Sequence, residues 1–291
     1  AKVVRELFMN SAEAGRMGLS EVPLGRLYAA AVEYLERRGS RVLFDARVES
    51  ASWNEPGRKW TVATNRPEAP QSDFLVLALP FEALAKLLPA LPGAPGAAGL
   101  AAQLERHEHR PICSAHLWFD REITALDHAV LLDREIHWLF NKSRLQPWRK
   151  TAGSYVELVV SASPAFAALP GERAIAQAVR ELAEFFPSVR SARLEKAAFV
   201  KELRATFAVT PGIDAARPAS ASPWSNGFLA GDWTATGWPS TMESAARSGH
   251  LAAEAVCRAA GAPRFALVSD LPPRGFMRLA RMPGKPGGPP E

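Results

Sequence analysis

The sequence predicts an α/β fold that is interrupted by an α+β segment, and three observations lead to this prediction. The run from Phe74 to Ala78 is apolar at every position, which is typical of a strand buried on both faces of a mostly parallel sheet. A second apolar run, 223–233, ends in Gly-Asp and precedes a long helical pattern. Between the two runs, residues 105–222 alternate strand and helix patterns and are richer in Trp and Phe than their flanks.

The first elements follow from periodicity and turn residues. A helix is predicted over 24–38, ended by Gly39, because its apolar residues share one face. These residues are Leu24, Leu27, Tyr28, Ala31 and Leu35. A strand is predicted over 41–44, and residues 46–53 and 59–64 pair best as a hairpin around the turn residues "NEPG". Pro80 ends the apolar run, and a short helix follows it over 81–88.

The later elements lie on either side of a change in composition. The Pro- and Gly-rich stretch 88–99 predicts a connection near a domain boundary. The predicted strands and helices after it are 114–119, 136–142, 154–162, helix 171–186, strand 195–209, and a last helix from Pro239 to about 260. We expect four parts, 1–104, 105–222, 223–262 and a Pro- and Gly-rich tail, 263–291, disordered beyond Ala280.

Composition excludes several classes of function. The net charge of +5 comes from scattered arginines without a run of five like charges, so we expect no nucleic-acid partner. Cys113 and Cys257 are the only cysteines, which excludes a disulfide framework and any CxxC motif and suggests the cytoplasm. The longest apolar stretches, such as "FLVLALPF", are far shorter than the roughly 18 residues of a spanning helix.

The segment "GDWTATGWPSTMESAARSGH" carries the strongest chemical signal. Gly231 lets the backbone approach a ligand closely at the end of a buried strand, and Asp232 places a carboxylate acceptor there. Pro239 precedes a helix whose first N–H groups, from Ser240 through Glu243, carry the positive end of its dipole. Such an N-terminus suits an electron-rich ring oxygen, as on the pyrimidine edge of a flavin.

Small residues keep this last helix slim and permit close packing against a cofactor or another backbone. They are Ala245, Ala246, Ser248, Gly249, Ala252 and Ala253. An ordinary strand–turn–helix unit with a small-residue packing face is the structural alternative. The ordered combination of Gly-Asp, Gly-x-Pro and Met-Glu favours the ligand site.

This segment resembles the flavin-closing motif of the amine oxidase and phytoene desaturase superfamily. Five blocks in the same order narrow the resemblance to the hydroxysqualene dehydroxylases, also called squalene-associated FAD-dependent desaturases. They are "GLSEVPLGRLY", "HWLFNK", "YVELVVSAS", "KELRATFAVTPGIDAARP" and "FLAGDWTATGWPSTMESAARSGHLAAEAV". The resemblance implies an α/β FAD-binding domain of the two-dinucleotide-binding, Rossmann-like type, interrupted by an α+β substrate domain.

The resemblance also implies roles for individual residues toward FAD. Val48 would pair with the adenine through its backbone, and Asp232 would bind the ribityl or pyrophosphate region. Met242 would offer its backbone N–H to the pyrimidine edge, while three side chains line the ring: Trp233, Thr234 and Trp238. The remaining expected cofactor-binding residues are Ala78, Leu79, Pro80, Gly231, Pro239, Ser240, Thr241 and Glu243.

The sequence departs from the family pattern at its start. It contains no Gly-x-Gly-x-x-Gly between a strand and a helix, and the Gly cluster at 93–99 carries Pro92 and Pro95, which prevent that turn. It also begins without Met. We therefore expect the chain to be an N-terminally incomplete part of a longer protein, with weakened or no FAD binding of its own.

The remaining signals are weaker. His107 and His109 in "HEHR" predict a solvated loop or strand edge and no metal site, whereas His116 and His137 are expected to be hydrogen-bonded core or pocket residues. The segment "RGFMRLARM", 274–282, could touch an anionic membrane surface, although a disordered basic tail is the simpler interpretation. Aromatic residues of 105–222 line either an apolar tunnel or the core: Trp118, Phe119, Trp138, Phe140, Tyr155 and Phe207.

These observations lead to hypotheses from two classes. The first is an FAD-dependent oxidoreductase that acts on a hydrophobic isoprenoid, peripheral to the membrane and associated with squalene-synthase-like proteins. The resemblance implies that reduced flavin delivers a hydride to an allylic carbon of hydroxysqualene as hydroxide or water leaves, giving squalene. A carotenoid desaturase or a flavin amine oxidase is the enzyme alternative, and the catalytic residues stay unknown. The second class is an inactive fragment, or a subunit completed by a separate N-terminal half.

Overall fold

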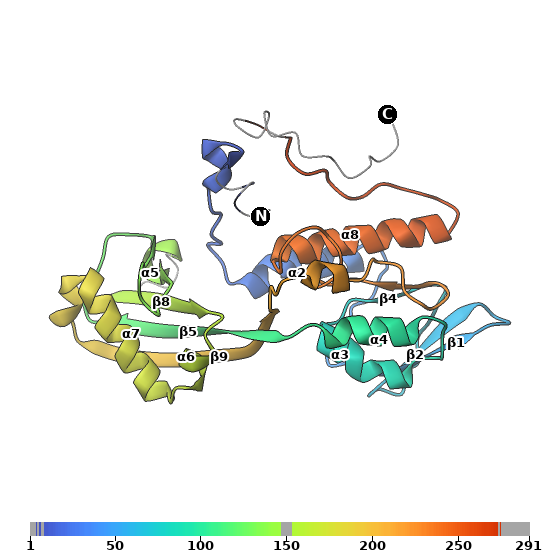
Figure 1. Cartoon of the computed structure of the whole chain (residues 1–291), viewed down its shortest axis with the longest axis horizontal. Coiled ribbons are helices and arrows are strands. Elements are labelled where there is room, and N and C mark those ends of the chain that lie inside the picture. The colour runs from blue at the N-terminus through green and yellow to red at the C-terminus, as the bar shows by residue number, and fades with distance from the viewer. Residues whose placement is uncertain (1–3, 5, 7–8, 147–152, 273, 275–291) are drawn as a thin grey trace. The chain divides into compact units, whose positions relative to one another are not determined.

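The computed structural model describes residues 4, 6, 9–146, 153–272 and 274, and the chain forms two compact units (Figure 1). Unit 1 comprises Ala1–Gly18, Asp45–His107 and Val209–Glu291, and unit 2 comprises Leu19–Phe44 and Glu108–Ala208. The expected boundaries at 104/105, 222/223 and 262/263 stay predictions. The expected membrane contact of 274–282 and the disorder beyond Ala280 lie, apart from residue 274, outside the described residues.

A pair of parallel strands organises unit 1. β4 (Leu75–Leu77) pairs with β10 (Gly227–Leu229), and Leu77 lies opposite Leu229. Both strands were expected, and β10 is buried throughout. The expectation that β4 is buried on both faces is wrong, because Val76 is 42% exposed on the face opposite to that of the buried Leu77.

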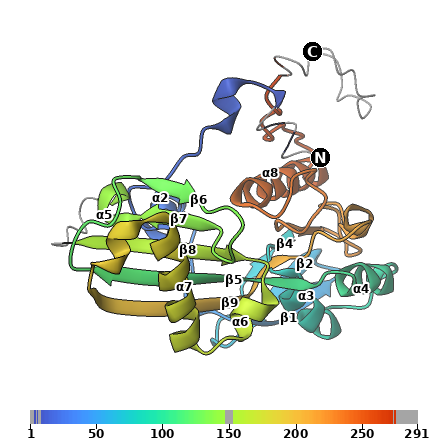
Figure 2. The same ribbon diagram turned by 60° about the vertical axis from the view of Figure 1, so that its left-hand side comes forward.

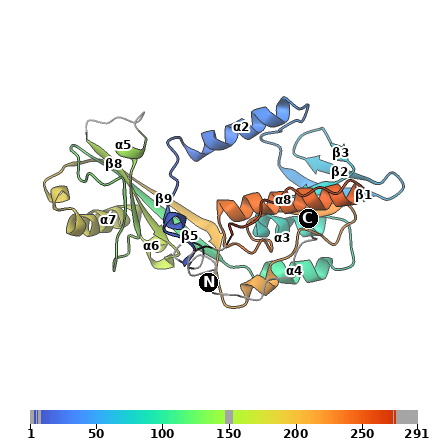
Figure 3. The same cartoon turned by 90° about the horizontal axis from the view of Figure 1, so that it is seen from above.

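Helices lie on both sides of this pair. Figures 1 and 2 show α8 (Met242–Ala259) on one side and α3 (Phe81–Leu87) with α4 (Ala97–Glu105) on the other, and Figure 3 shows α8 passing over α3. The unit is therefore layered α/β/α. The expected connection over 88–99 contains the 3-10 helix η3 (Leu88–Ala90) and the start of α4, because Gly96 adopts a positive φ of 91° that begins the helix.

A second sheet of unit 1 contains the predicted hairpin. β1 (Val48–Asn54) pairs antiparallel with β2 (Lys59–Thr64), and β3 (Gln71–Ser72) extends the sheet. Trp60 of β2 is 1% exposed, and its indole N–H donates to the carbonyl of Ser225, 3.1 Å away. This bond ties the hairpin to the segment just before β10.

Unit 2 is built on a five-stranded antiparallel sheet. The strand order is β6 (His128–Val130), β7 (Trp138–Asn141), β8 (Ser154–Ser161), β5 (His109–Phe119) and β9 (Leu194–Phe207). Figure 2 shows α7 (Gly171–Phe185) lying across the sheet, and its inward side chains Ala174, Ala178 and Leu182 are fully buried. Strands β5, β7, β8 and β9 and helix α7 confirm the predicted elements.

Short helices complete the two units. They are η2 (Ala12–Gly15), α5 (Lys142–Leu145), α6 (Pro164–Ala168), η5 (Pro187–Arg190) and η6 (Ile213–Ala216). Helix η6 directly precedes Arg217, which is 6% exposed.

Helix α2 (Leu24–Glu36) confirms one prediction while a neighbouring one fails. The helix forms as predicted, but its apolar face is open: Leu24 and Leu27 are each 51% exposed and Tyr28 is 55% exposed. Residues 41–44 are irregular, so the predicted strand there is wrong. A strand needs a pairing partner, and the described residues supply none to this segment.

Candidate functional site

The carboxyl edge of the β4–β10 pair brings together two segments predicted from the sequence. The N–H of Ala230 donates to the carbonyl of Leu77 at 3.1 Å, so residues 78–80 and 231–234 leave the sheet at one edge. The indole N–H of Trp233 donates to the carbonyl of Leu79 at 2.8 Å. Ala78 and Pro80 are exposed, Leu79 is half-buried, and Trp233 is 1% exposed.

The chain between β10 and α8, residues 230–241, is called the closing loop below. Gly231 has a φ of 145°, and a Cβ at this position would lie 2.3 Å from Nε1 of Trp233. Its N–H donates to Ser248 Oγ at 2.8 Å, and its carbonyl accepts from the Thr234 hydroxyl at 2.8 Å. The absence of a side chain at Gly231 therefore leaves room for the indole of Trp233. The sequence analysis explained this glycine by the approach of a ligand and did not predict its contact with Trp233.

The first turn of α8 is exposed and capped. Helix α8 begins at Met242, two residues beyond the predicted start at Ser240, because Thr241 is the N-cap and accepts the N–H of Ser244 at 3.2 Å. Met242 is 56% exposed, and Thr241 and Glu243 are exposed as well. The positive end of this 18-residue helix is thus largely exposed.

Two polar side chains of the closing loop lie beside this turn. Asp232 is half-buried, and one of its carboxylate oxygens accepts a hydrogen bond from the Ser240 hydroxyl. Its second oxygen adds an acceptor for a hydroxyl-bearing ligand. The edge thus offers a helix N-terminus and a carboxylate acceptor side by side.

Trp238 and Pro239 form the outer part of the loop. Both are half-buried, and the indole N–H of Trp238 donates to Asp270 Oδ1 at 3.1 Å. Arg247 of α8 pairs with both Asp270 and Glu243 at 3.1 Å, and its guanidinium lies 5.8 Å from the Trp238 ring centroid. These contacts hold the indole against the first two turns of the helix.

Arg217 belongs to the candidate site, although no local pattern in the sequence predicted a role for it. It follows η6 directly and is 6% exposed. Its guanidinium donates to the carbonyls of Asp232 and Trp233 at 2.9 and 3.3 Å, and to the hydroxyl of Thr236 at 3.2 Å. The only sequence signal was its position in one of the blocks that resemble the family.

His107 is a second residue placed differently from its prediction. It is 6% exposed, so the expectation of a solvated histidine is wrong. Its Nδ1 lies 3.0 Å from the carbonyl of Gln103, and its ring centroid lies 5.2 Å from that of Phe81 and 6.2 Å from that of Trp233. Burial lowers the pKa of His107, and the positive charge of Arg217 lowers it further.

Val48 belongs to a different sheet from the other candidates. It is the first residue of β1, opposite Thr64, and is 36% exposed. Its expected contact with the adenine stays a prediction.

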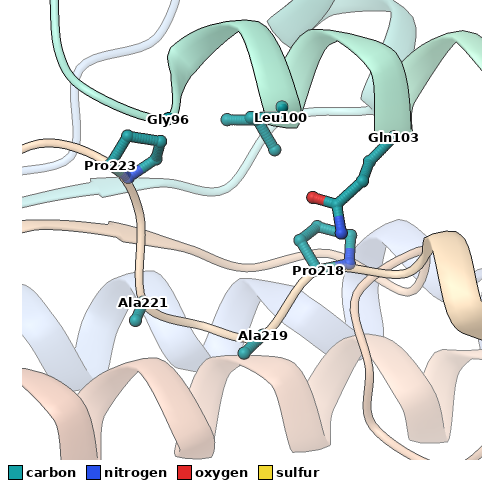
Figure 4. Close-up of a pocket in the computed structure, with 8 residues that line it drawn as sticks. Gly96, Leu100, Gln103, Pro218, Ala219, Ala221 and Pro223 are labelled. Atoms are coloured by element: carbon teal, nitrogen blue, oxygen red, sulfur yellow. The ribbon is translucent and has the colours of Figure 1, made fainter.

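Figure 4 shows a pocket of about 430 Å³ elsewhere in unit 1, between α4 and residues 218–223. Its lining is small and mostly apolar: Gly96, Gly99, Leu100, Gln103, Pro218, Ala219, Ala221 and Pro223. The Gln103 amide, which reaches toward Pro218, is the polar side chain of this lining. The pocket thus offers far less chemistry than the carboxyl edge.

The aromatic candidates of unit 2 divide into two groups. Phe119 and Phe207 are 2% and 4% exposed, which makes them core residues. On β5 and β8, the Trp118 and Tyr155 rings stack with centroids 4.3 Å apart, and the Tyr155 hydroxyl lies 2.9 Å from His116 Nδ1. On β7, Trp138 stacks with Phe140 at 5.7 Å.

Both strand histidines are hydrogen-bonded, as expected. His116 contacts Tyr155, and His137 Nδ1 accepts the N–H of Ser161 at 3.1 Å.

Comparisons with known proteins identify one matching family model and several relatives. The family model described as "Flavin containing amine oxidoreductase" matches residues 3–257. The 15-cis-phytoene desaturase of Synechococcus elongatus is 31% identical over 249 residues, which cover 82% of this chain and 52% of that protein. The hydroxysqualene dehydroxylase of Sinorhizobium fredii is 31% identical over 258 residues, which cover 87% of this chain and 55% of that protein.

A solved structure shows the same fold at lower identity. Reduced UDP-galactopyranose mutase superposes with a TM-score of 0.60 at 13% identity, over 81% of this chain and 50% of that one. The chain thus spans about half the length of the curated relatives that it matches.

Proposed function

The chain belongs to the family of flavin containing amine oxidoreductases, and from this premise we propose that its closing loop and the first turn of α8 bind the flavin end of FAD. The α/β layers of unit 1 are the FAD-binding fold of this family. The single observation that carries the proposal is the exposed N-terminus of α8 beside the Asp232 carboxylate.

The residues at this edge fit the chemistry of the flavin. A helix N-terminus favours an electron-rich pyrimidine edge, and a carboxylate accepts hydrogen bonds from ribityl hydroxyls. The residues that would hold the group are Ala78, Leu79, Pro80, Gly231, Asp232, Trp233, Thr234, Trp238, Pro239, Ser240, Thr241, Met242 and Glu243. Because the sequence contains no Gly-x-Gly-x-x-Gly, no glycine-rich loop is assigned to the pyrophosphate, and Asp232 is the residue proposed for the ribityl or pyrophosphate region.

We further propose that the whole protein is an FAD-dependent oxidoreductase that converts hydroxysqualene to squalene. Two hydroxysqualene dehydroxylases, 31% and 30% identical to this chain, support this choice. A phytoene desaturase at 31% identity supports a carotenoid desaturase as the second candidate. When bound, reduced FAD would supply the two electrons of the dehydroxylation, whereas oxidised FAD would accept the two electrons of a desaturation. In either case the chain's own residues would bind the flavin, orient it and exclude water.

Unit 2 offers three half-buried aromatic side chains for contact with an isoprenoid, Trp118, Trp138 and Phe140, while Tyr155 is buried at 5% exposure and supports Trp118. Its two aromatic stacks, Trp118 with Tyr155 and Trp138 with Phe140, are the part of the proposed substrate site that this unit supplies. Among the described residues, no helix combines the length and apolarity needed to cross a bilayer. Peripheral contact with a lipid surface and association with squalene-synthase-like proteins belong to the same proposal.

An absorbance spectrum and an FAD titration of the purified chain test the cofactor, with and without a co-expressed N-terminal segment that carries Gly-x-Gly-x-x-Gly. Flavin bands in either preparation support the proposal, and their absence from both contradicts it. The flavin-bound form is then supplied with hydroxysqualene under reducing conditions and with phytoene under oxidising conditions. Squalene formation supports the dehydroxylase, whereas phytoene desaturation alone supports the second candidate.

A further inference from the structure

We propose that Arg217 is the positioning residue of the closing loop and that its buried charge tunes the flavin, an inference that rests on the function proposed above. The Arg217 side chain is only 3% exposed. Burying a guanidinium is costly unless hydrogen bonds satisfy its five N–H donors. The hydrogen-bond partners of Arg217 therefore indicate the structural role of the buried guanidinium.

One guanidinium links the loop to the helix. Nη2 of Arg217 donates to the Asp232 carbonyl at 2.9 Å and to the Thr236 hydroxyl at 3.2 Å, while Nε donates to the Trp233 carbonyl at 3.3 Å. The same Nη2 lies 3.4 Å from the hydroxyl of Ser244, in the first turn of α8. The arginine thus fixes the loop backbone relative to the end of the helix that faces the proposed flavin.

Hydroxyl groups around Arg217 reinforce this link. The Thr236 and Ser244 hydroxyls lie 2.6 Å apart, and Ser244 Oγ is 3.0 Å from the Asp232 carbonyl. The backbone contributes as well, because the N–H of Ala235 donates to the carbonyl of Pro218 at 2.8 Å. Charge-assisted hydrogen bonds of this kind are about twice as strong as neutral ones. Arg217 is therefore the strongest donor in a network that sets the shape of the loop.

The charge of Arg217 adds to the field at the same place. Its ion-pair partner Asp214, 3.2 Å away, has a side chain that is 89% exposed, so solvent screens that carboxylate. The positive end of the α8 dipole lies beside the guanidinium. The guanidinium and the helix dipole both stabilise negative charge near the first turn of α8. In the proposed complex, the pyrimidine edge of the reduced flavin would carry negative charge at this place. Removing the cation should therefore lower the reduction potential of the bound flavin.

Two variants separate the geometry from the charge. Arg217→Met removes both, whereas Arg217→Lys keeps the charge but loses the planar fork that reaches several acceptors. Arg258→Met is the matched control, because Arg258 lies in α8 and its side chain is 58% exposed. The measurements are amide hydrogen exchange of residues 231–245, FAD affinity, and the midpoint potential of the bound flavin.

For Arg217→Met we expect faster exchange of residues 231–245, FAD binding weaker by roughly tenfold or more, and a lower midpoint potential. Arg217→Lys should lose the exchange protection but retain a potential closer to that of the wild type. Arg258→Met should match the wild type in all three measurements.

Unchanged loop exchange in Arg217→Met would overturn the positioning role, and so would an equal increase in exchange of the β1–β2 hairpin. An unchanged potential would overturn the tuning role. If the wild-type chain binds no flavin in any preparation, the proposed function fails, while the exchange comparison still decides the positioning role.

Discussion

His107 shows how a single buried side chain makes stability depend on pH. Burial lowers its pKa, the hydrogen bond to the Gln103 carbonyl opposes this shift, and the charge of Arg217 reinforces it. In mild acid the unfolded chain therefore binds more protons at this histidine than the folded chain does. The stability that neutral His107 contributes is fully present above the ordinary pKa of about 6.5. It is lost as the pH falls through the lower pKa of the folded state.

We expect the melting temperature of the protein to fall on acidification below about pH 6.5, and His107→Gln to reduce that dependence. Thermal unfolding followed by circular dichroism between neutral and mildly acidic pH measures it. His128→Gln is the control, because His128 is exposed on β6. A pH dependence that is the same in His107→Gln and in the wild type would contradict this account.

Arg217 and His107 also show what local patterns in the sequence cannot reveal. Both contact Trp233, which lies well apart from them along the chain. The charged residues of "HEHR" favoured a solvated segment, and a lone arginine before proline has no periodicity to mark it as buried. Burial of these two polar residues depends on contacts that only the folded chain creates.

At the scale of elements, the turn after β10 depends on the absence of a side chain at Gly231. A Cβ there would lie 2.3 Å from Nε1 of Trp233, whose ring is buried and bonded to the Leu79 carbonyl. We expect Gly231→Ala to lower the free energy of unfolding by about 3 kcal/mol, from both the clash and the positive φ. Gly237 also has a positive φ, 77°, but its Cβ would meet nothing within 4 Å.

Gly237→Ala is therefore the matched control, with an expected loss of about 1 kcal/mol from the backbone alone. Chemical denaturation of both variants measures the difference. Equal decreases in the free energy of unfolding would show that the clash with Trp233 contributes nothing to the cost of a side chain at position 231.

Elements with strong local patterns were predictable, and those that depend on partners were not. Apolar runs and stop residues located β4, β10, α7 and α8, because these signals lie within each element. The segment 41–44 has an apolar run but no pairing strand among the described residues, and α4 begins inside a stretch whose prolines predicted a connection. The contacts with the flavin stay predictions. Sequence and structure together describe the protein residues at the carboxyl edge of the β4–β10 pair, which is the protein side of the proposed site.

At the scale of the whole molecule, the longer segment of unit 2, Glu108–Ala208, begins and ends at adjacent points. The N–H of Ala208 donates to the carbonyl of Glu108 at 2.7 Å, and His109 of β5 lies opposite Phe207 of β9. An inserted unit whose ends meet can be accommodated without disturbing the fold that receives it. The division between the two units accordingly falls between His107 and Glu108, where α4 leads into β5.

The core of unit 2 is formed entirely by its own residues, so we expect the two units to lose stability separately. Leu158 of β8 is fully buried in that core, and Leu229 of β10 is fully buried in unit 1. Leu158→Ala should cost about 2–5 kcal/mol and speed hydrogen exchange in peptides from 108–208, while those from 209–262 keep their protection. Leu229→Ala should produce the reverse pattern. If each variant accelerates exchange in both sets of peptides equally, the chain unfolds as one cooperative unit, and substitutions in the aromatic surface of unit 2 would then disturb flavin binding through global stability.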